Sequence, residues 1–235
     1  MTALLAAIAI TRTMTAHADD RVAIGSGTAL LSLHGVPQQH SRFSYSCTLT
    51  AVGYDNAGRL IGITNAHCFY DNFGDQWLYD AIYLERPGQT GFIDVGIGPI
   101  GHVAVIGPGN PVAPGPSGVG LDYAVIVFDS TKVAPSASVG ATPVTDIGPP
   151  PPPGAPVCRH GSRTGRTCGI MLGHSGPYFI TTLIESPGDS GAPVLSGSTL
   201  IGTLWMTSTA TSISAILADL DQIGGIGAGF HLATR

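Results

Sequence analysis

The sequence predicts an all-β protein made of two antiparallel β domains, and three observations support this expectation. Thirty-three glycines and eighteen prolines in 235 residues imply many turns, and frequent turns favour short strands over long helices. Short runs rich in Val, Ile, Thr and Tyr recur between these turns. Five consecutive prolines then divide the strand-rich sequence into two parts. Short antiparallel strands of this kind form a closed barrel or a sandwich.

In the first part, a hairpin is the clearest element. Residues 44–52 are rich in Thr, Tyr and Val, Asp55-Asn56-Ala57-Gly58 is a turn signal, and 60–64 returns as an apolar strand. Further strands are expected at 79–84, 91–95, 102–106 and 123–128.

The second part follows a linker expected at 147–156, because consecutive prolines favour an extended polyproline segment. We therefore expect one β domain over residues 19–146 and another over 157–235. In the second, apolar residues at helical spacing predict one short C-terminal helix, with Thr211 or Ser212 as its N-cap. The strands of this second domain are expected at 170–172, 178–183, 192–195 and 200–206.

The composition excludes several classes of protein. A net charge of −5 with a single lysine argues against nucleic-acid binding, which requires a basic face. Hydrophobic residues make up 43% and charged residues only 11%, unlike a disordered chain. No apolar run approaches the roughly 20 residues of a membrane-spanning helix. We expect a monomer that binds neither nucleic acid nor membrane.

The N-terminus and the cysteines indicate export. The apolar run 3–10 precedes Ala16-His17-Ala18, which predicts a signal peptide over residues 1–18, although no Lys or Arg precedes the run. The alternative is an unusually apolar N-terminal arm. Four cysteines fit an oxidising compartment, and the absence of a C-x-x-C pair gives little support to a zinc or redox site. Sequence proximity favours the pairs Cys47–Cys68 and Cys158–Cys168 among three possible pairings.

Residues 96–101 match the dinucleotide fingerprint G-x-G-x-x-G. That fingerprint requires a following helix. Four prolines occur between residues 108 and 116, so no helix forms there and the nucleotide-binding reading is rejected.

The candidate chemistry centres on Ser190, which lies between two glycines in G-D-S-G-A-P at 188–193. Glycine permits the turn that exposes such a hydroxyl beside free backbone N–H groups, as acyl transfer requires. His67 ends an apolar strand in T-N-A-H-C at 64–68, and Asp122 begins another in L-D-Y-A-V-I at 121–126. Taken singly, each of the three has a structural reading as a turn or strand-end residue.

Together the three motifs, in the order His, Asp, Ser, resemble the chymotrypsin-like serine proteases, particularly the secreted bacterial branch of the alpha-lytic and streptogrisin type. The resemblance covers about residues 22–223. It implies two six-stranded antiparallel barrels packed at right angles, with the active site between them. It also implies a disulfide Cys47–Cys68 beside the histidine and a second, Cys158–Cys168, in a loop of the second barrel.

The resemblance further implies a role for each site residue. Ser190 would be the nucleophile, His67 the general base and acid, and Asp122 its orienting partner. The N–H groups of Gly188 and Ser190 would form the oxyanion hole. The substrate would be a peptide or protein, with no metal or organic cofactor. No animal-type activated N-terminus is found, so Arg159 is expected to pair with Asp189 instead.

The expected specificity pocket departs from the family. Ile184 lies where trypsin-like members carry an acid, although the neighbouring Glu185 could turn inward. Trp205 and Met206 replace the usual glycine-rich wall and could close the pocket, which predicts a preference for Ala or Val at P1. An alternative is a binding or scaffold protein of the protease fold with an impaired pocket. An α/β esterase is disfavoured by Ala192 and by the order of the three residues.

Overall fold

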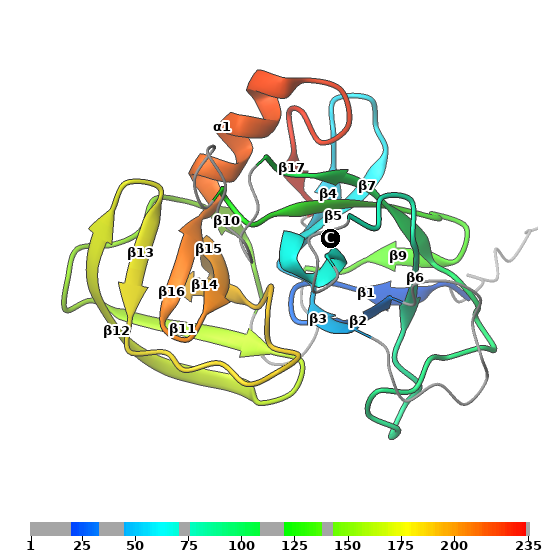
Figure 1. The fold of residues 1–235 in the computed structure, drawn as a ribbon, viewed down its shortest axis with the longest axis horizontal. Helices are drawn as coiled ribbons and strands as arrows, with labels where there is room; N and C mark the ends of the chain where they lie inside the picture. Colours follow the sequence, from blue (N-terminus) through cyan, green and yellow to red (C-terminus); the bar gives the residue numbers. More distant parts are fainter. Residues whose placement is uncertain (1–19, 33–44, 71–75, 109–119, 138–142, 234–235) are drawn as a thin grey trace, which may run out of the picture.

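A computed structural model describes residues 20–32, 45–70, 76–108, 120–137 and 143–233. The predicted signal peptide lies outside these residues. The regular structure of the described part is mostly β, with one α-helix near the C-terminus, which confirms the predicted fold class (Figure 1). Within it, no helix is long and apolar enough to cross a membrane.

The second half of the chain forms a closed six-stranded barrel. Strand β15 pairs on one side with β14 and on the other with β16, which completes the ring β15-β14-β11-β12-β13-β16. A two-stranded parallel contact adds β10 outside this ring. The strands are β10 (Asp146–Ile147), β11 (Pro156–Gly161), β12 (Gly165–Ser175), β13 (Tyr178–Thr181), β14 (Pro193–Ser196), β15 (Thr199–Met206) and β16 (Thr209–Ser212).

The first half forms an eight-stranded sheet in the order β17-β4-β5-β8-β7-β6-β2-β3. Strands β3 and β4 do not pair, but only Leu49 and Thr50 separate them in the chain. The sheet therefore curls back on itself around this bend. Its strands are β2 (Ala29–Ser32), β3 (Tyr45–Thr48), β4 (Ala51–Tyr54), β5 (Leu60–Thr64), β6 (Ala81–Leu84), β7 (Gly101–Ile106), β8 (Ala124–Phe128) and β17 (His231–Leu232). A separate pair consists of β1 (Val22–Ile24) and β9 (Val133–Pro135).

One predicted strand, 91–95, is wrong. Its residues form turns, and only Ile93 makes an isolated bridge, to Glu85. Gly91 has φ 78°, a left-handed conformation that interrupts an extended strand. The Asp94 carboxylate accepts a hydrogen bond from the N–H of Gly96, which closes a further local turn.

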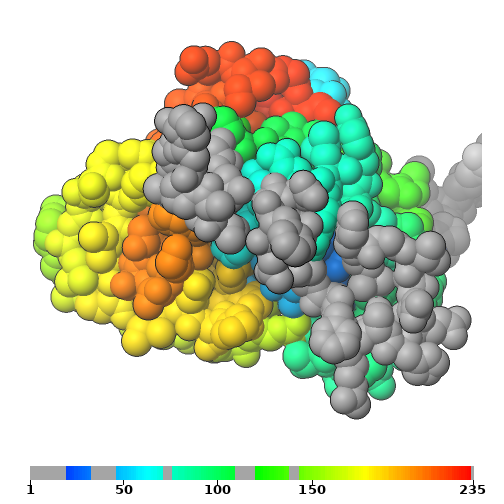
Figure 2. Space-filling view, in the orientation of Figure 1, coloured from blue at the N-terminus to red at the C-terminus, as the bar shows by residue number. Residues whose placement is uncertain are grey.

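The C-terminal segment returns to the first half of the molecule. Helix α1 (Ile213–Ile223) follows the second barrel in sequence, yet its Ile216 and Leu220 share an apolar cluster with Ile61 and Val125 of the first sheet. The hydroxyl of Tyr123 donates a 2.6 Å hydrogen bond to Asp219 on the helix. Figures 1 and 2 show α1 lying across the top of the molecule, beside both halves. The helix therefore helps to hold the two halves together.

Candidate active site

The structure brings His67 and Asp122 into direct contact. His67 lies on the short 3-10 helix η1 (Ala66–Phe69), which directly follows β5, and Asp122 lies just before β8, the neighbour of β5 in the sheet. His67 Nδ1 is 2.7 Å from Asp122 Oδ2. The backbone N–H of His67 donates to Asp122 Oδ1 at 2.8 Å, so both carboxylate oxygens are fixed.

Burial makes this contact electrostatically strong. The Asp122 side chain is fully buried, whereas the imidazole retains 23% of its exposure. Burial raises the pKa of Asp122, against the opposing effect of the His67 ring and of nearby backbone N–H groups. Burial alone would lower the pKa of His67, but the Asp122 carboxylate, and to a lesser degree Glu185, raise it above 6.5. The protonated form of the imidazole is thus stabilised, as a general base requires.

The backbone at Asp122 is unusual. Its φ is 51°, in the left-handed region where residues other than glycine are uncommon. Its carbonyl accepts a hydrogen bond from the side chain of Asn65, 2.9 Å away. Asn65 was not singled out by the sequence, although its position two residues before His67 could have drawn attention to it. The strained turn directs the carboxylate toward η1.

Ser190 lies on a tight loop that contacts the first half of the molecule. Its carbonyl accepts a hydrogen bond from the N–H of Thr48 at 2.7 Å. A Cβ on Gly191 would lie 2.2 Å from the carbonyl oxygen of Thr48 and 2.4 Å from Thr64 Oγ1. The backbone of Gly191 also has φ 85°, in the left-handed region. Only glycine therefore allows this loop to reach the strand leading to His67. Among the described contacts, Ser190 Oγ makes no hydrogen bond with His67.

The two N–H groups of the predicted oxyanion hole are not used in hydrogen bonds within the described part of the protein. In the described part of the chain, neither Gly188 N–H nor Ser190 N–H donates a hydrogen bond to another protein group. The carbonyl of Gly188 is held from behind by the hydroxyls of Thr48 at 2.8 Å and Ser162 at 3.0 Å. Thr48 and Ser162 carry no sequence signal for this role, because their partner lies far away in the chain.

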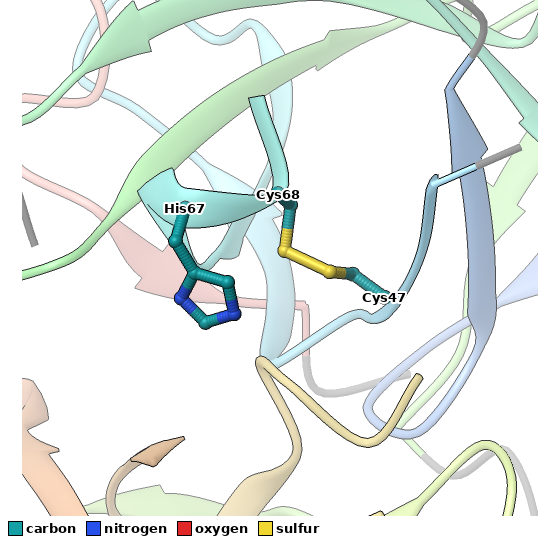
Figure 3. A group of neighbouring side chains, drawn as sticks. All are labelled: Cys47, His67 and Cys68. Carbon is teal, nitrogen blue, oxygen red and sulfur yellow. A yellow bond between two sulfur atoms is a disulfide. The ribbon is translucent and has the colours of Figure 1, made fainter. Parts of the chain in front are cut away.

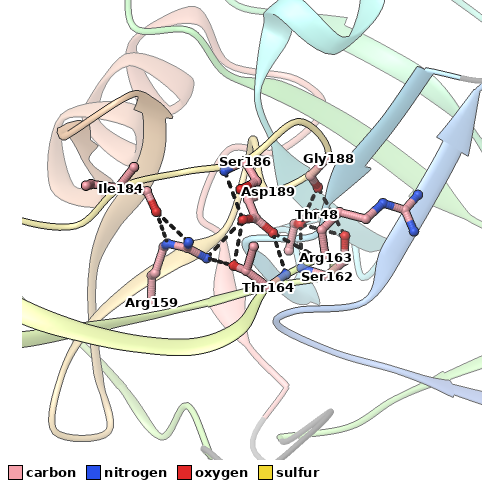
Figure 4. Close-up of polar contacts among 9 residues, drawn as sticks. All are labelled: Thr48, Arg159, Ser162, Arg163, Thr164, Ile184, Ser186, Gly188 and Asp189. Carbon is pink, nitrogen blue, oxygen red and sulfur yellow. Dashed lines mark hydrogen bonds and ion pairs between the residues drawn. The ribbon is translucent and has the colours of Figure 1, made fainter. Parts of the chain in front are cut away.

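The loop before Ser190 is held by a buried network around Asp189 (Figure 4). Arg159 Nη1 lies 3.1 Å from Asp189 Oδ2, with side chains 2% and 0% exposed. The remaining guanidinium nitrogens of Arg159 donate to the carbonyl of Ile184. Asp189 also accepts hydrogen bonds from Ser186, Arg163 and Thr164. Every oxygen of this buried carboxylate is thereby satisfied.

The four predicted pocket residues do not share one environment. Ile184 and Met206 are 68% and 51% exposed, so neither fills an enclosed apolar slot. Trp205 is partly buried, and its ring packs against that of Tyr178 with centroids 5.6 Å apart. The exposure of Met206 does not fit the apolar plug expected from the sequence. Among the four, only Glu185 has a buried side-chain oxygen, Oε2, that lacks a hydrogen-bond partner.

Both predicted disulfides are present, Cys47–Cys68 and Cys158–Cys168. The first connects β3 to η1 directly beside His67 (Figure 3). Cys47, His67 and Cys68 lie close enough to suggest a metal site. A cysteine binds metal as its thiolate, however, and both sulfurs are already joined to each other. The cluster is therefore a disulfide beside a histidine.

Comparison with known proteins rests on structure alone, since no protein-family model and no curated protein matches the sequence. Thermobifida fusca protease A is similar with a TM-score of 0.59 at 18% identity, covering 91% of this chain and 100% of that one. Cellulomonas bogoriensis chymotrypsin is similar with a TM-score of 0.54 at 21% identity, over the same shares. An inactivated protease paralogue of the scabies mite has a TM-score of 0.51 at 16% identity, covering 83% and 92%.

The structural similarity demonstrates a common fold. Because the sequence identities are this low, the chemistry has to be argued from the site. The resemblance predicted from the three sequence motifs is confirmed at that level. The chain has the fold of the bacterial chymotrypsin-like serine proteases.

Proposed function

We propose that the protein is a secreted serine endopeptidase that cleaves peptide bonds through Ser190, His67 and Asp122. The observation that carries the proposal is the buried Asp122 carboxylate 2.7 Å from His67 Nδ1. This contact orients the ring so that Nε2 is available to accept a proton. The fold and the order of the three motifs support it, and the two disulfides fit an extracellular protein.

In the proposed reaction, Ser190 Oγ attacks the scissile carbonyl while His67 Nε2 takes the hydroxyl proton. The tetrahedral intermediate places its negative oxygen against the N–H groups of Gly188 and Ser190. Collapse breaks the C–N bond, His67 returns the proton to the leaving amine, and an acyl-enzyme remains. Water activated by His67 then hydrolyses the ester and restores Ser190.

A fluorophosphonate probe tests this proposal, because such a probe reacts with an activated serine. The folded wild-type protein should be labelled at Ser190, as located by peptide mass spectrometry. Ser190→Ala should abolish labelling, whereas Ser214→Ala, which removes an exposed serine on α1, should not. Equal labelling of both variants would reject the assignment of Ser190.

A second candidate function is a binding or scaffold protein that uses the fold without catalysis. Two observations favour it: Ser190 Oγ makes no hydrogen bond with His67 among the described contacts, and a structurally similar protein is an inactivated protease. This second function would be supported if the folded wild-type protein were not labelled at Ser190 by the fluorophosphonate probe. Free enzymes often tighten this hydrogen bond only when substrate binds, so we place the candidate second.

A further inference from the structure

The backbone that carries Glu185 is fixed on both sides by one buried side chain. Arg159 donates to the carbonyl of Ile184, immediately before Glu185, and forms the ion pair with Asp189, four residues after it. Figure 4 shows Arg159 between these two points. Ser186 N–H, immediately after Glu185, donates to Asp189 Oδ2 at 3.1 Å. The backbone at Glu185 is therefore held by the same network that holds the loop leading to Ser190.

The Glu185 carboxylate is only partly satisfied. The backbone N–H of Thr207 lies near it and lowers its pKa, but Oε2 is buried and has no hydrogen-bond partner in the described part of the chain. Burial raises the pKa of Glu185, and the charge of Asp189 raises it further, while Thr207, His67 and Arg159 act in the opposite direction. A buried oxygen left unpaired is costly, so a donor arriving there would be bound well.

The charges around the site leave this carboxylate without a direct ionic partner. Asp122 contacts His67, and Asp189 contacts Arg159. Arg163 contacts Glu85 instead. The electrostatic environment thus favours an incoming cation over a neutral or acidic group.

The Glu185 side chain as a whole is not sealed from solvent. Glu185 is half-buried, so part of it faces solvent. Ile184 and Met206 project outward, and the ring of Trp205 lies against Tyr178. None of these three side chains is itself fully buried, as a packed apolar plug would be.

We infer that Glu185 selects an arginine or lysine side chain at P1, immediately before the cleaved bond. This inference rests on the proposed peptidase function and replaces the expected preference for Ala or Val. Glu185 lies on the loop that leads to Ser190, its carboxylate lies near the backbone of Thr207 on the opposite segment, and its charge raises the pKa of His67. A guanidinium or ammonium group supplies the donor that Oε2 lacks, in a charge-assisted hydrogen bond.

The experiment compares peptide substrates that differ only at P1, carrying Arg, Lys, citrulline, Ala or Phe. Citrulline has nearly the shape of arginine but no charge. The wild-type protein should cleave after Arg and Lys with the highest kcat/KM, and roughly 10- to 150-fold better than after citrulline, the range of a hydrogen bond to a charged group. Glu185→Gln should remove that difference, because cleavage after Arg and Lys should fall relative to cleavage after citrulline, Ala and Phe. The matched control Asp146→Asn removes an exposed carboxylate and should keep the preference.

Fluorophosphonate labelling and benzamidine binding separate the two hypotheses. If Ser190 is labelled but Ala, Phe or citrulline is preferred at P1, the peptidase proposal stands and the role of Glu185 is overturned. If Ser190 is not labelled, the peptidase proposal fails and the P1 inference fails with it. Benzamidine, a cationic arginine mimic, should raise the thermal midpoint of the wild type and of Ser190→Ala but not of Glu185→Gln. An equal shift in Glu185→Gln would also overturn the assignment.

Discussion

Arg159 and Asp189 form an ion pair from which water is excluded, with Nη1 3.1 Å from Oδ2 and side chains 2% and 0% exposed. The pair joins β11 of the second barrel to the residue immediately before Ser190. Gly161 makes room for it, since a Cβ there would lie 2.1 Å from Asp189 Oδ1. The loop that carries Ser190 is therefore fixed by a group within the second barrel itself.

Arg159→Met should destabilise the protein strongly. The substitution leaves the fully buried Asp189 without its counterion, and breaking a buried pair on one side costs about 3–5 kcal/mol of unfolding free energy. Urea denaturation should show the loss as a lower midpoint at neutral pH. The matched control Arg86→Met, whose guanidinium bonds only the exposed Gln89 side chain among the described contacts, should change the midpoint little. A midpoint for Arg159→Met equal to that of the control would contradict the structural role of the pair.

Asp122→Asn should reduce turnover while preserving the fold. An amide of the same shape keeps the buried volume but disturbs the ring orientation and cannot stabilise the imidazolium. By analogy with other Ser-His-Asp sites, kcat should fall about 10⁴-fold. Steady-state kinetics on a P1-Arg peptide measures this, and Asp146→Asn serves as the control for loss of one carboxylate.

Retention of more than a few per cent of turnover in Asp122→Asn would show that the contact with His67 is structural only. Far-UV circular dichroism distinguishes a loss of chemistry from a loss of fold. A variant that is inactive because it is unfolded is replaced by Asp122→Glu, which keeps the charge and should retain more turnover than Asn.

The sequence predicted the fold class and the two disulfides well, because each depends on local signals. Alternating turns and strands, paired cysteines at short separation and an apolar strand on either side of the site are all visible in the letters. The packing of the C-terminal helix against the first half of the molecule was harder to predict from the sequence. Helix α1 packs on the first sheet because its apolar stripe completes a cluster formed by Ile61 and Val125, which sequence spacing does not reveal.

The pocket was the least predictable part. Whether Glu185 or Met206 faces the site depends on the course of the backbone, which at Glu185 is held by Arg159 from a distant part of the chain. The sequence favoured Met206 and Trp205 as an apolar plug, from their bulk and from the resemblance to family members that close the pocket in this way. The structure has Met206 exposed and an oxygen of Glu185 buried.

Activity should rise with pH through a midpoint above 6.5. Catalysis needs neutral His67, whose pKa is raised because the carboxylates of Asp122 and Glu185 outweigh the effect of burial. The same shift contributes stability that is fully present below pH 6.5 and is lost as the pH rises through the folded pKa of His67. The kcat/KM profile of a P1-Ala peptide gives the midpoint. Glu185→Gln should move this midpoint to lower pH, whereas the control Asp146→Asn should leave it in place. A wild-type kcat/KM that falls between pH 5 and 7 would contradict the role of His67.

The disulfide beside His67 should matter more for catalysis than the other disulfide, although both should stabilise the fold. Cys47–Cys68 closes 21 residues and Cys158–Cys168 closes 10, and loops of these lengths contribute roughly 3 kcal/mol each in the chain-entropy description. Replacing either pair with alanines should therefore lower the urea midpoint similarly.

Only Cys47–Cys68 connects η1, which carries His67, to β3, whose Thr48 holds the Gly188 carbonyl. Its loss loosens His67 relative to the oxyanion donors, and small displacements of catalytic groups cost rate steeply. Fluorophosphonate labelling of Ser190, measured well below both urea midpoints, should slow at least about tenfold in the Cys47/Cys68 variant. The Cys158/Cys168 variant is the matched control and should label near the wild-type rate. Equal rates in the two variants would mean that the first disulfide acts on stability alone.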